Sequence, residues 1–318
     1  MDQKGLTLLV INYNRIGSDN MNENKTNINW YPGHMAKTKR QILEDLKLID
    51  VVIEILDARI PVSSQNPDIA EIIKNKKRII VLNKCDLANK KETDKWINKF
   101  KNEGIIAINA DSNSGNGINK VLEGINTIMK EELEKNARSG RIGKKIRVLI
   151  LGIPNVGKSS FINRISKKTS AEVGNKPGVT KSKQWVKVDD RIELLDTPGV
   201  LWPKFESQKV ALNLAYTGTI KDEILDKIEV AFSLLKYLLE NYIENISNRY
   251  DIGIKEIKNI LADDEQAENE NIYQIMMLIG KKRGALVSGG YVDDTKVANI
   301  ILEDFRTGKL GNITIEKV

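Results

Sequence analysis

The chain has 318 residues, a length that predicts about two domains at roughly 150 residues each. Lysine and arginine number 50 against 43 aspartates and glutamates, and the net charge of +7 permits a polyanionic partner without requiring one. The single cysteine and single histidine exclude an internal disulfide and a zinc site built from several such residues. Since no apolar run approaches the roughly 20 residues of a membrane span, we expect a cytoplasmic protein without membrane contact.

The first 28 residues contain a short apolar run, GLTLLVINYN, followed by the polar SDNMNENKTN. The apolar run lacks a small-residue cleavage site, which disfavours a signal peptide. We interpret residues 1–28 as a disordered extension, or as the product of a start assigned too early, with Met21 as the alternative start.

From Asn29 onward, strand-like and helix-like segments alternate. Apolar runs predict strands within 50–61, 78–87 and 104–110, and helical spacing predicts helices over 66–77, 91–104 and 118–137. Residues 145–160 predict a strand, a glycine-rich turn and a helix, and residues 185–200 predict two strands. This alternation indicates an α/β fold with a mostly parallel sheet and a ligand site at the carboxyl ends of its strands.

The pattern changes near residue 205. Helical periodicity prevails over 207–261, the acidic stretch 262–271 is interpreted as an exposed loop, and a last helix is predicted over 293–306. Asp293 or Asp294 is its expected cap, and its expected buried face comprises Val297, Ile300, Ile301 and Phe305. The predicted domains are thus an α/β domain over 29–205 and a smaller all-α domain over 206–318.

The segment GIPNVGKS matches the phosphate-loop pattern G-x-x-x-x-G-K-[ST] and stands between a predicted strand and helix, the context that supports it. Its glycines let backbone N–H groups face phosphate oxygens, Lys158 supplies charge to the β- and γ-phosphates, and Ser159 offers a hydroxyl to magnesium. A tight turn without a ligand is the weaker alternative. The predicted phosphate-binding residues are Asn155, Val156, Gly157, Lys158, Ser159 and Ser160.

The segment DTPG, at the end of the strand-like RIELLDTPG, is also expected to contact the phosphates and their magnesium ion. Asp196 can hold magnesium through water, and the N–H of Gly199 can contact the γ-phosphate. Thr180, in KPGVT, can complete the magnesium shell when GTP is bound. The alternatives without a role in binding are a common turn at DTPG and a surface threonine at position 180.

The tetrapeptide Asn83-Lys84-Cys85-Asp86 matches the guanine-binding pattern Asn-Lys-x-Asp. A carboxylate at Asp86 can accept hydrogen bonds from guanine N1–H and the exocyclic amine, which adenine cannot offer in that geometry. Asn83 and Lys84 are expected to brace the phosphate loop and cover the base. Asn109-Ala110 is expected to place a backbone N–H near guanine O6. Together with the phosphate loop, these residues predict GTP and GDP as ligands and oppose an ATPase.

The order of the motifs is inverted, because NKCD precedes the phosphate loop whereas ordinary GTPases place it last. Joining the old termini of a domain and cutting it elsewhere preserves a site that converges at one sheet edge. We therefore interpret the α/β domain as a circularly permuted P-loop GTPase domain.

On these residues the chain resembles the circularly permuted GTPases, specifically the bacterial ribosome biogenesis GTPase A family. The resemblance also includes WYPGHMAK, DARIPVSSQNP, KPGVTKSKQW and GYVDDTKVANIILEDFRTGKLG. It implies a late assembly factor for the large ribosomal subunit, which binds the precursor, its ribosomal RNA and associated proteins in the GTP state and is released on hydrolysis. It also implies stimulation of hydrolysis by that particle and by potassium, and an RNA-binding helical domain; no DNA partner is expected.

Hydrolysis needs a residue that orients the attacking water, a role that a glutamine has in Ras. The corresponding position here is Val200, whose aliphatic side chain cannot orient water. The resemblance assigns that role to His34, whose alternative is a structural residue at a helix entry. Asn155 is the expected potassium ligand, and its alternative is an ordinary loop asparagine.

Basic stretches fit an RNA partner, although each alone is explained by a solvated surface. Residues 137–147 contain five basic side chains, and residues 164–187 contain seven against the single acid Glu172. Lys281, Lys282, Arg283, Arg306 and Lys309 add basic charge in the helical domain. The functional alternative is a GTP-dependent protein-binding switch with incidental hydrolysis.

Overall fold

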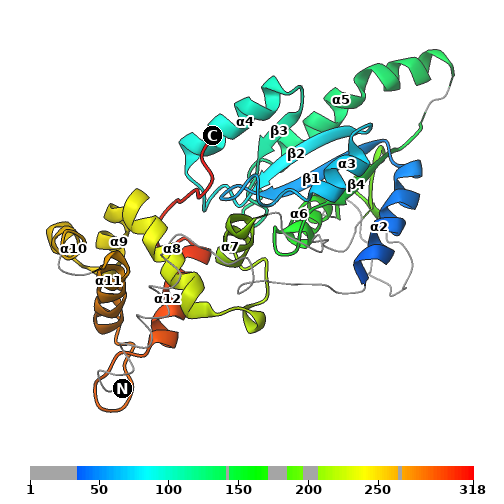
Figure 1. The fold of residues 1–318 in the computed structure, drawn as a ribbon. Coiled ribbons are helices and arrows are strands. Elements are labelled where there is room, and N and C mark those ends of the chain that lie inside the picture. Colours follow the sequence, from blue (N-terminus) through cyan, green and yellow to red (C-terminus); the bar gives the residue numbers. More distant parts are fainter. Residues whose placement is uncertain (1–33, 141–142, 171–184, 196–206, 264–266) are drawn as a thin grey trace. The chain divides into compact units, whose positions relative to one another are not determined.

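The computed structural model describes residues 34–140, 143–170, 185–195, 207–263 and 267–318 (Figure 1). This part of the chain forms two compact units. The α/β unit comprises residues up to Leu214 together with Thr314–Val318, and the helical unit comprises Ala215–Ile313. The domain boundary expected at residues 205 and 206 lies outside the described residues.

Among the described residues of the α/β unit, the strands form one six-stranded sheet in the order β3-β2-β1-β4-β6-β5. All neighbouring pairs are parallel except β5 with β6, which confirms the mostly parallel sheet. The central strand β1 is buried along its whole length, as a strand covered on both faces must be. The strands are β1 (Val51–Asp57), β2 (Lys77–Asn83), β3 (Ile106–Asn109), β4 (Ile146–Leu151), β5 (Trp185–Lys187) and β6 (Ile192–Leu195).

Helices cover both faces of this sheet, which gives three layers. Ile42 of α2 and Ile73 of α3 pack with Val52 and Leu149 on one face. The indole of Trp96 from α4 packs with Leu56 on that same face, because residues 52 and 56 of a strand point the same way. On the opposite face, Gly124 of α5 lies against Ile79 and Ile108. The helices of this unit are α2 (His34–Asp45), η1 (Leu46–Leu48), α3 (Pro67–Ile73), α4 (Lys90–Asn102), α5 (Ile118–Arg138), α6 (Lys158–Ser170) and α7 (Gln208–Tyr216), whose last two residues belong to the helical unit.

Asparagine caps fix the starts of two helices that follow strands. Asn66 accepts hydrogen bonds from the N–H groups of Asp68 and Ile69, and Pro67 occupies the first position of α3. The side chain of Asn89, six residues after the end of β2, accepts from the N–H of Glu92 and caps the start of α4. The caps therefore fix where the loops that follow β1 and β2 end.

The helical unit contains η2 (Asp222–Ile224), α8 (Lys227–Asn241), α9 (Ile243–Tyr250), α10 (Ile254–Leu261), α11 (Glu268–Lys282) and α12 (Asp294–Arg306). Asp293 caps α12 by accepting from the N–H of Lys296, and the predicted face is buried at three of its four positions, with Ile300 half-buried. One expectation was wrong: the acidic stretch 262–271 is not a loop throughout. Its end, from Glu268, is the first turn of α11, because acidic residues suit a helix N-terminus, and Asn271 there is buried.

None of the helices in the described part of the chain is long and apolar enough to cross a membrane.

Candidate functional site

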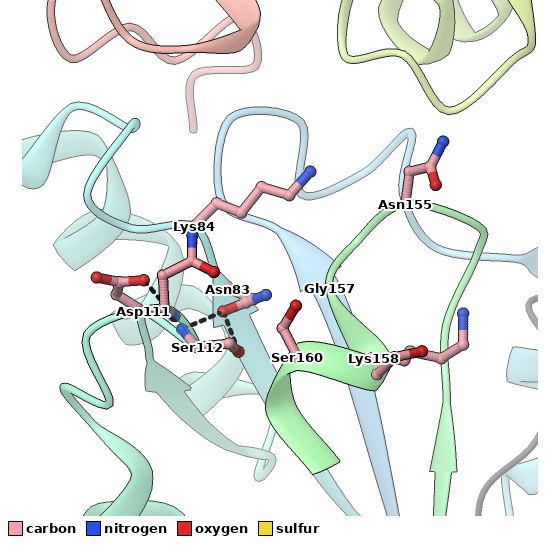
Figure 2. A pocket seen from close by; sticks show the side chains of 10 residues that line it. Asn83, Lys84, Asp111, Ser112, Asn155, Gly157, Lys158 and Ser160 are labelled. Atoms are coloured by element: carbon pink, nitrogen blue, oxygen red, sulfur yellow. Dashed lines mark hydrogen bonds between the residues drawn. The ribbon is translucent and has the colours of Figure 1, made fainter. Parts of the chain in front are cut away.

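A cavity of about 380 Å³ lies at the carboxyl ends of β2 and β4 in the α/β unit (Figure 2). This volume falls within the range of about 300–1,000 Å³ that is usual for small-molecule sites. The segments that form the cavity lie far apart in sequence, as a sheet edge built from several parallel strands allows. Its described lining consists of Asn83, Lys84, Asp111, Ser112, Asn113, Asn155, Gly157, Lys158, Ser159 and Ser160.

The loop between β4 and α6 forms one wall of the cavity. A Cβ on Gly152 would approach the carbonyl oxygen of Ile55 to 2.6 Å, so only glycine lets the chain turn this closely past β1. The helix α6 begins at Lys158, so its N-terminal N–H groups and positive dipole end lie at the cavity wall. The Nζ of Lys158 donates to the carbonyl oxygen of Ile153 at 2.8 Å and is thereby held over the loop. This arrangement suits a polyphosphate.

Asn83 joins the two expected motifs. Its Nδ2 donates to the carbonyl oxygen of Val156 at 2.7 Å. Its Oδ1 accepts from the N–H of Ser112 at 3.1 Å and from the hydroxyl of Ser112 at 2.7 Å (Figure 2). The side chain of Asn83 is buried, and a Cβ on Gly157 would lie 2.3 Å from its Nδ2. The end of β2, the loop after β3 and the phosphate loop are therefore locked together by one side chain.

Lys84 is held by a buried ion pair. Its Nζ lies 3.1 Å from Oδ2 of Asp57, and the guanidinium of Arg59 donates to both oxygens of that carboxylate at 2.9 and 2.8 Å. Asp57 and Arg59 are each 1% exposed. Burial acts to raise the pKa of Asp57, but the charges of Arg59 and Lys84 and the hydrogen bonds from Arg59 outweigh it and hold that pKa far below its ordinary value. Asp57 therefore stays ionised and keeps Lys84 beside the cavity.

Asp86, which is exposed, and the half-buried Cys85 directly follow Lys84 of the cavity lining but do not belong to that lining themselves. Desolvation, followed by the negative charge of Asp111, raises the pKa of Asp86. A neighbouring carboxylate makes this edge of the site electronegative, which suits the N–H donors of a base better than a phosphate.

Asn109 and Ala110 do not line the described cavity. The N–H of Ala110 donates to the carbonyl oxygen of Leu82 at 2.9 Å. This N–H continues the ladder between β2 and β3, and the loop that reaches the cavity begins one residue later. A backbone N–H of this segment near guanine O6 stays a prediction.

Several expected residues lie outside the described residues, namely Thr180, Asp196 and Gly199, together with Val200. His34 is the first residue of α2, and its side chain also lies outside what the structure describes. The structure brings together Asn83, Lys84, Asn155, Gly157, Lys158, Ser159 and Ser160.

Five residues at or behind the cavity were missed. Ser112 and its neighbours Asp111 and Asn113 directly follow the predicted Asn109-Ala110, so a longer loop after β3 would have included them. Asp57 and Arg59 lie in the segment DARIP, where an aspartate ends a buried strand beside the NKCD strand, and that placement was the available signal.

The structure shows that several residues of the basic stretches are engaged in ion pairs within the chain. Arg306 donates to both carboxylate oxygens of Asp222 at 2.8 and 3.0 Å and to the carbonyl oxygens of Ala215 and Tyr216, so it fastens the helical unit internally. Lys144 pairs with Asp50 at 3.0 Å, and Lys145 pairs with Glu193. Lys281, Lys282 and Arg283, at the end of α11, are exposed, and Lys282 and Arg283 lie 3.6 Å from Asp251 and 3.8 Å from Asp304.

A mostly parallel sheet whose phosphate loop is bridged by an asparagine from an upstream NKCD motif defines a circularly permuted P-loop GTPase. The family model described as 50S ribosome-binding GTPase matches residues 147–276. A Bacillus cereus protein named ribosome biogenesis GTPase A is 46% identical over 91% of this chain and 93% of its own length. Its Thermotoga maritima namesake is 30% identical over 91% of this chain and 94% of its own length.

The solved structures agree with these relatives. The crystal structure of GNP-bound YlqF from T. maritima matches with a TM-score of 0.59 and 26% identity, over 88% of this chain and 98% of that one. A GDP-bound structure of the same protein matches with the same TM-score. The chain belongs to the ribosome biogenesis GTPase A family, and is therefore a GTPase of ribosome biogenesis that uses guanine nucleotides.

Proposed function

We propose that this protein hydrolyses GTP during late assembly of the large ribosomal subunit, binds the precursor in its GTP state and leaves after hydrolysis. The observation that carries the proposal is the hydrogen bond from Asn83 to the carbonyl oxygen of Val156, which unites a guanine-selecting motif with a phosphate loop at one cavity. The model described as 50S ribosome-binding GTPase and the names of the relatives support the ribosomal part of the proposal.

In this site Lys158 and the N-terminus of α6 bind the phosphates, and Asp86 selects the guanine ring. The hydroxyl of Ser159, at the cavity wall, fits a magnesium ligand, with Thr180 and Asp196 as its partners. Bound magnesium would neutralise charge on the β- and γ-phosphates. The protein side chains bind and orient the nucleotide and exclude the wrong base.

His34 is proposed to orient the attacking water, because the aliphatic Val200 cannot. Replacing His34 by alanine should abolish stimulated hydrolysis and leave the Kd of GDP within about twofold of wild type, since the group acts on water rather than on the ground state. Loss of GDP binding together with hydrolysis would assign His34 a structural role instead.

Asn155 lines the cavity in a left-handed backbone conformation, with φ of 60°, at the turn of the phosphate loop. We assign it as the ligand of a potassium ion that would act as a fixed positive charge beside the phosphates. Equal hydrolysis rates in potassium and in sodium would remove this assignment.

The exposed Lys281, Lys282 and Arg283 are the proposed phosphate-backbone contacts in the helical unit. Their removal should weaken binding to ribosomal RNA and reduce the slope of log affinity against log salt, by about one for each phosphate that is no longer neutralised. A cytoplasmic location follows from this role in assembly.

The deciding experiment combines turnover with sedimentation. We expect large subunits to raise the rate of GTP hydrolysis, more in potassium than in sodium, and to pellet the protein with a GTP analogue but not with GDP. Nucleotide-dependent binding to another protein, without stimulation by subunits, would favour the protein-binding switch.

A further inference from the structure

The last residues of the chain return from the helical unit to the α/β unit, where they lie against α4 (Figure 1). The hydroxyl of Thr314 accepts from the N–H of Asn89 at 3.0 Å, and the N–H of Ile315 donates to the carbonyl oxygen of Arg59 at 2.9 Å. The indole N–H of Trp96 donates to the carbonyl oxygen of Glu316 at 2.8 Å. Thr314 is fully buried, so this segment is an integral part of the α/β unit.

The carboxylate of Glu316 accepts several hydrogen bonds. One oxygen accepts from the N–H of Val62 at 2.6 Å, and both accept from the N–H of Ser63 at 3.0 and 3.1 Å. The hydroxyl of Ser63 and the Nδ2 of Asn213, the latter at 3.0 Å, also donate to it. A charged acceptor with this many donors fixes the loop that follows β1.

The segment contacts the backbone of two residues, Arg59 and Asn89, that are each connected to the NKCD motif. Arg59, whose carbonyl oxygen accepts from Ile315, holds Asp57, and Asp57 holds the Nζ of Lys84. Asn89, whose N–H donates to Thr314, caps α4 and follows Asp86 by three residues. The segment therefore contacts the backbone on both sides of the guanine-selecting residues.

We propose that Thr314, Ile315 and Glu316 form a carboxyl-terminal latch that positions Lys84 and Asp86 for guanine, with Glu316 as its chief positioning residue. The proposal rests on the nucleotide site proposed above. The latch contacts the loop after β1 and the start of α4, both of which lead to the guanine-selecting residues. Its loss should therefore impair base discrimination more than phosphate binding.

The test measures the Kd of GDP and of inosine diphosphate, which lacks the exocyclic amine, for the full-length protein and its variants. Glu316→Ala should raise the Kd of GDP about tenfold and bring the two Kd values closer together, because a charged acceptor is lost and the loop after β1 is released. Glu316→Gln should behave similarly, because its amide group turns a donor toward the donors of Val62 or Ser63.

Two controls separate positioning from stability. A chain lacking only the exposed Lys317 and Val318 should bind GDP as wild type does. Val121→Ala, in the buried face of α5, should lower the thermal midpoint without changing the ratio of the two Kd values. Equal ratios in wild type and Glu316→Ala, or the same loss in Val121→Ala, would overturn the latch. Failure of the wild-type protein to bind GDP would instead overturn the nucleotide site itself.

Discussion

The side-chain amide of Asn83 and the carbonyl oxygen of Val156 lie 2.7 Å apart, although 73 residues separate them in the chain. The two residues belong to motifs whose order is reversed relative to ordinary GTPases. The bond shows that the order of motifs along the chain is immaterial once parallel strands bring their carboxyl ends to one edge.

Replacing Asn83 by alanine should therefore damage both halves of the site. Its loss leaves the buried donor of Ser112 without its acceptor and releases the phosphate loop, at a cost of about 1–3 kcal/mol in GDP binding. Isothermal titration with GDP measures this, and Asn98→Ala on the exposed side of α4 is the matched control. Equal affinities for the two variants would contradict the bridging role.

Changing Asp86 to asparagine should alter which base is bound. The amide can donate to the oxygen that xanthine carries in place of the guanine amine, so preference should move from GDP toward xanthosine diphosphate by about 100-fold or more. Competition binding with both nucleotides measures the shift, and Asp94→Asn, an exposed aspartate on α4, serves as the control. An unchanged preference in Asp86→Asn would remove the guanine-selecting role.

The parts of the molecule that could be predicted from sequence are those with strong local signals. The apolar runs that end in NKCD and in GIPNVGKS located strands β2 and β4 and placed Asn83 and Lys158 at one edge. The alternation of segments predicted the mostly parallel sheet, and the cap of α12 was expected at Asp293 or Asp294.

The missed features depend on contacts between distant segments. The pairing of Asp57 with Lys84 arises only because β1 lies beside β2, and Ser63 and Val62, which donate to the carboxylate of Glu316, are 253 and 254 residues away along the chain. The sequence did not show that the N–H of Ala110 belongs to the ladder between β2 and β3, because sequence pattern fixes strand ends poorly.

Gly157 should not tolerate a side chain. Its φ is +95°, and an added Cβ would lie 2.3 Å from the Nδ2 of Asn83. Gly104 provides a matched control, because its φ is +75° and nothing lies within 4 Å of its added Cβ. Gly104→Ala should cost about 1–2 kcal/mol through its backbone alone.

Gly157→Ala should cost that amount plus about 1–3 kcal/mol for the disrupted Asn83 hydrogen bond, and it should also weaken GDP binding. Urea unfolding of both variants, with and without GDP, measures the difference. Equal losses of stability and unchanged GDP binding would show that Asn83 can move aside.

The buried carboxylate of Asp57 should make the α/β unit sensitive to acid. Because its pKa in the folded protein lies below the ordinary value of 3.8, ionised Asp57 stabilises the fold above that pH. This stabilisation is lost as the pH falls below 3.8 toward the folded-state pKa. Urea unfolding at a series of pH values should show a steeper decline for the wild-type protein than for Asp57→Asn. Parallel declines would contradict the assignment.

Since the chain enters the helical unit after Leu214 and leaves it before Thr314, that unit is a topological insertion within the α/β unit. A fragment that stops at Leu214 would lack the partners of Trp96, Ser63 and Asn89, so it would be an incomplete enzyme rather than a minimal one. A stand-alone catalytic core has to be made by fusing residue 214 to residue 314 through a linker. The same topology predicts that the helical unit can be shortened or replaced while both flanking segments of the α/β unit remain in place.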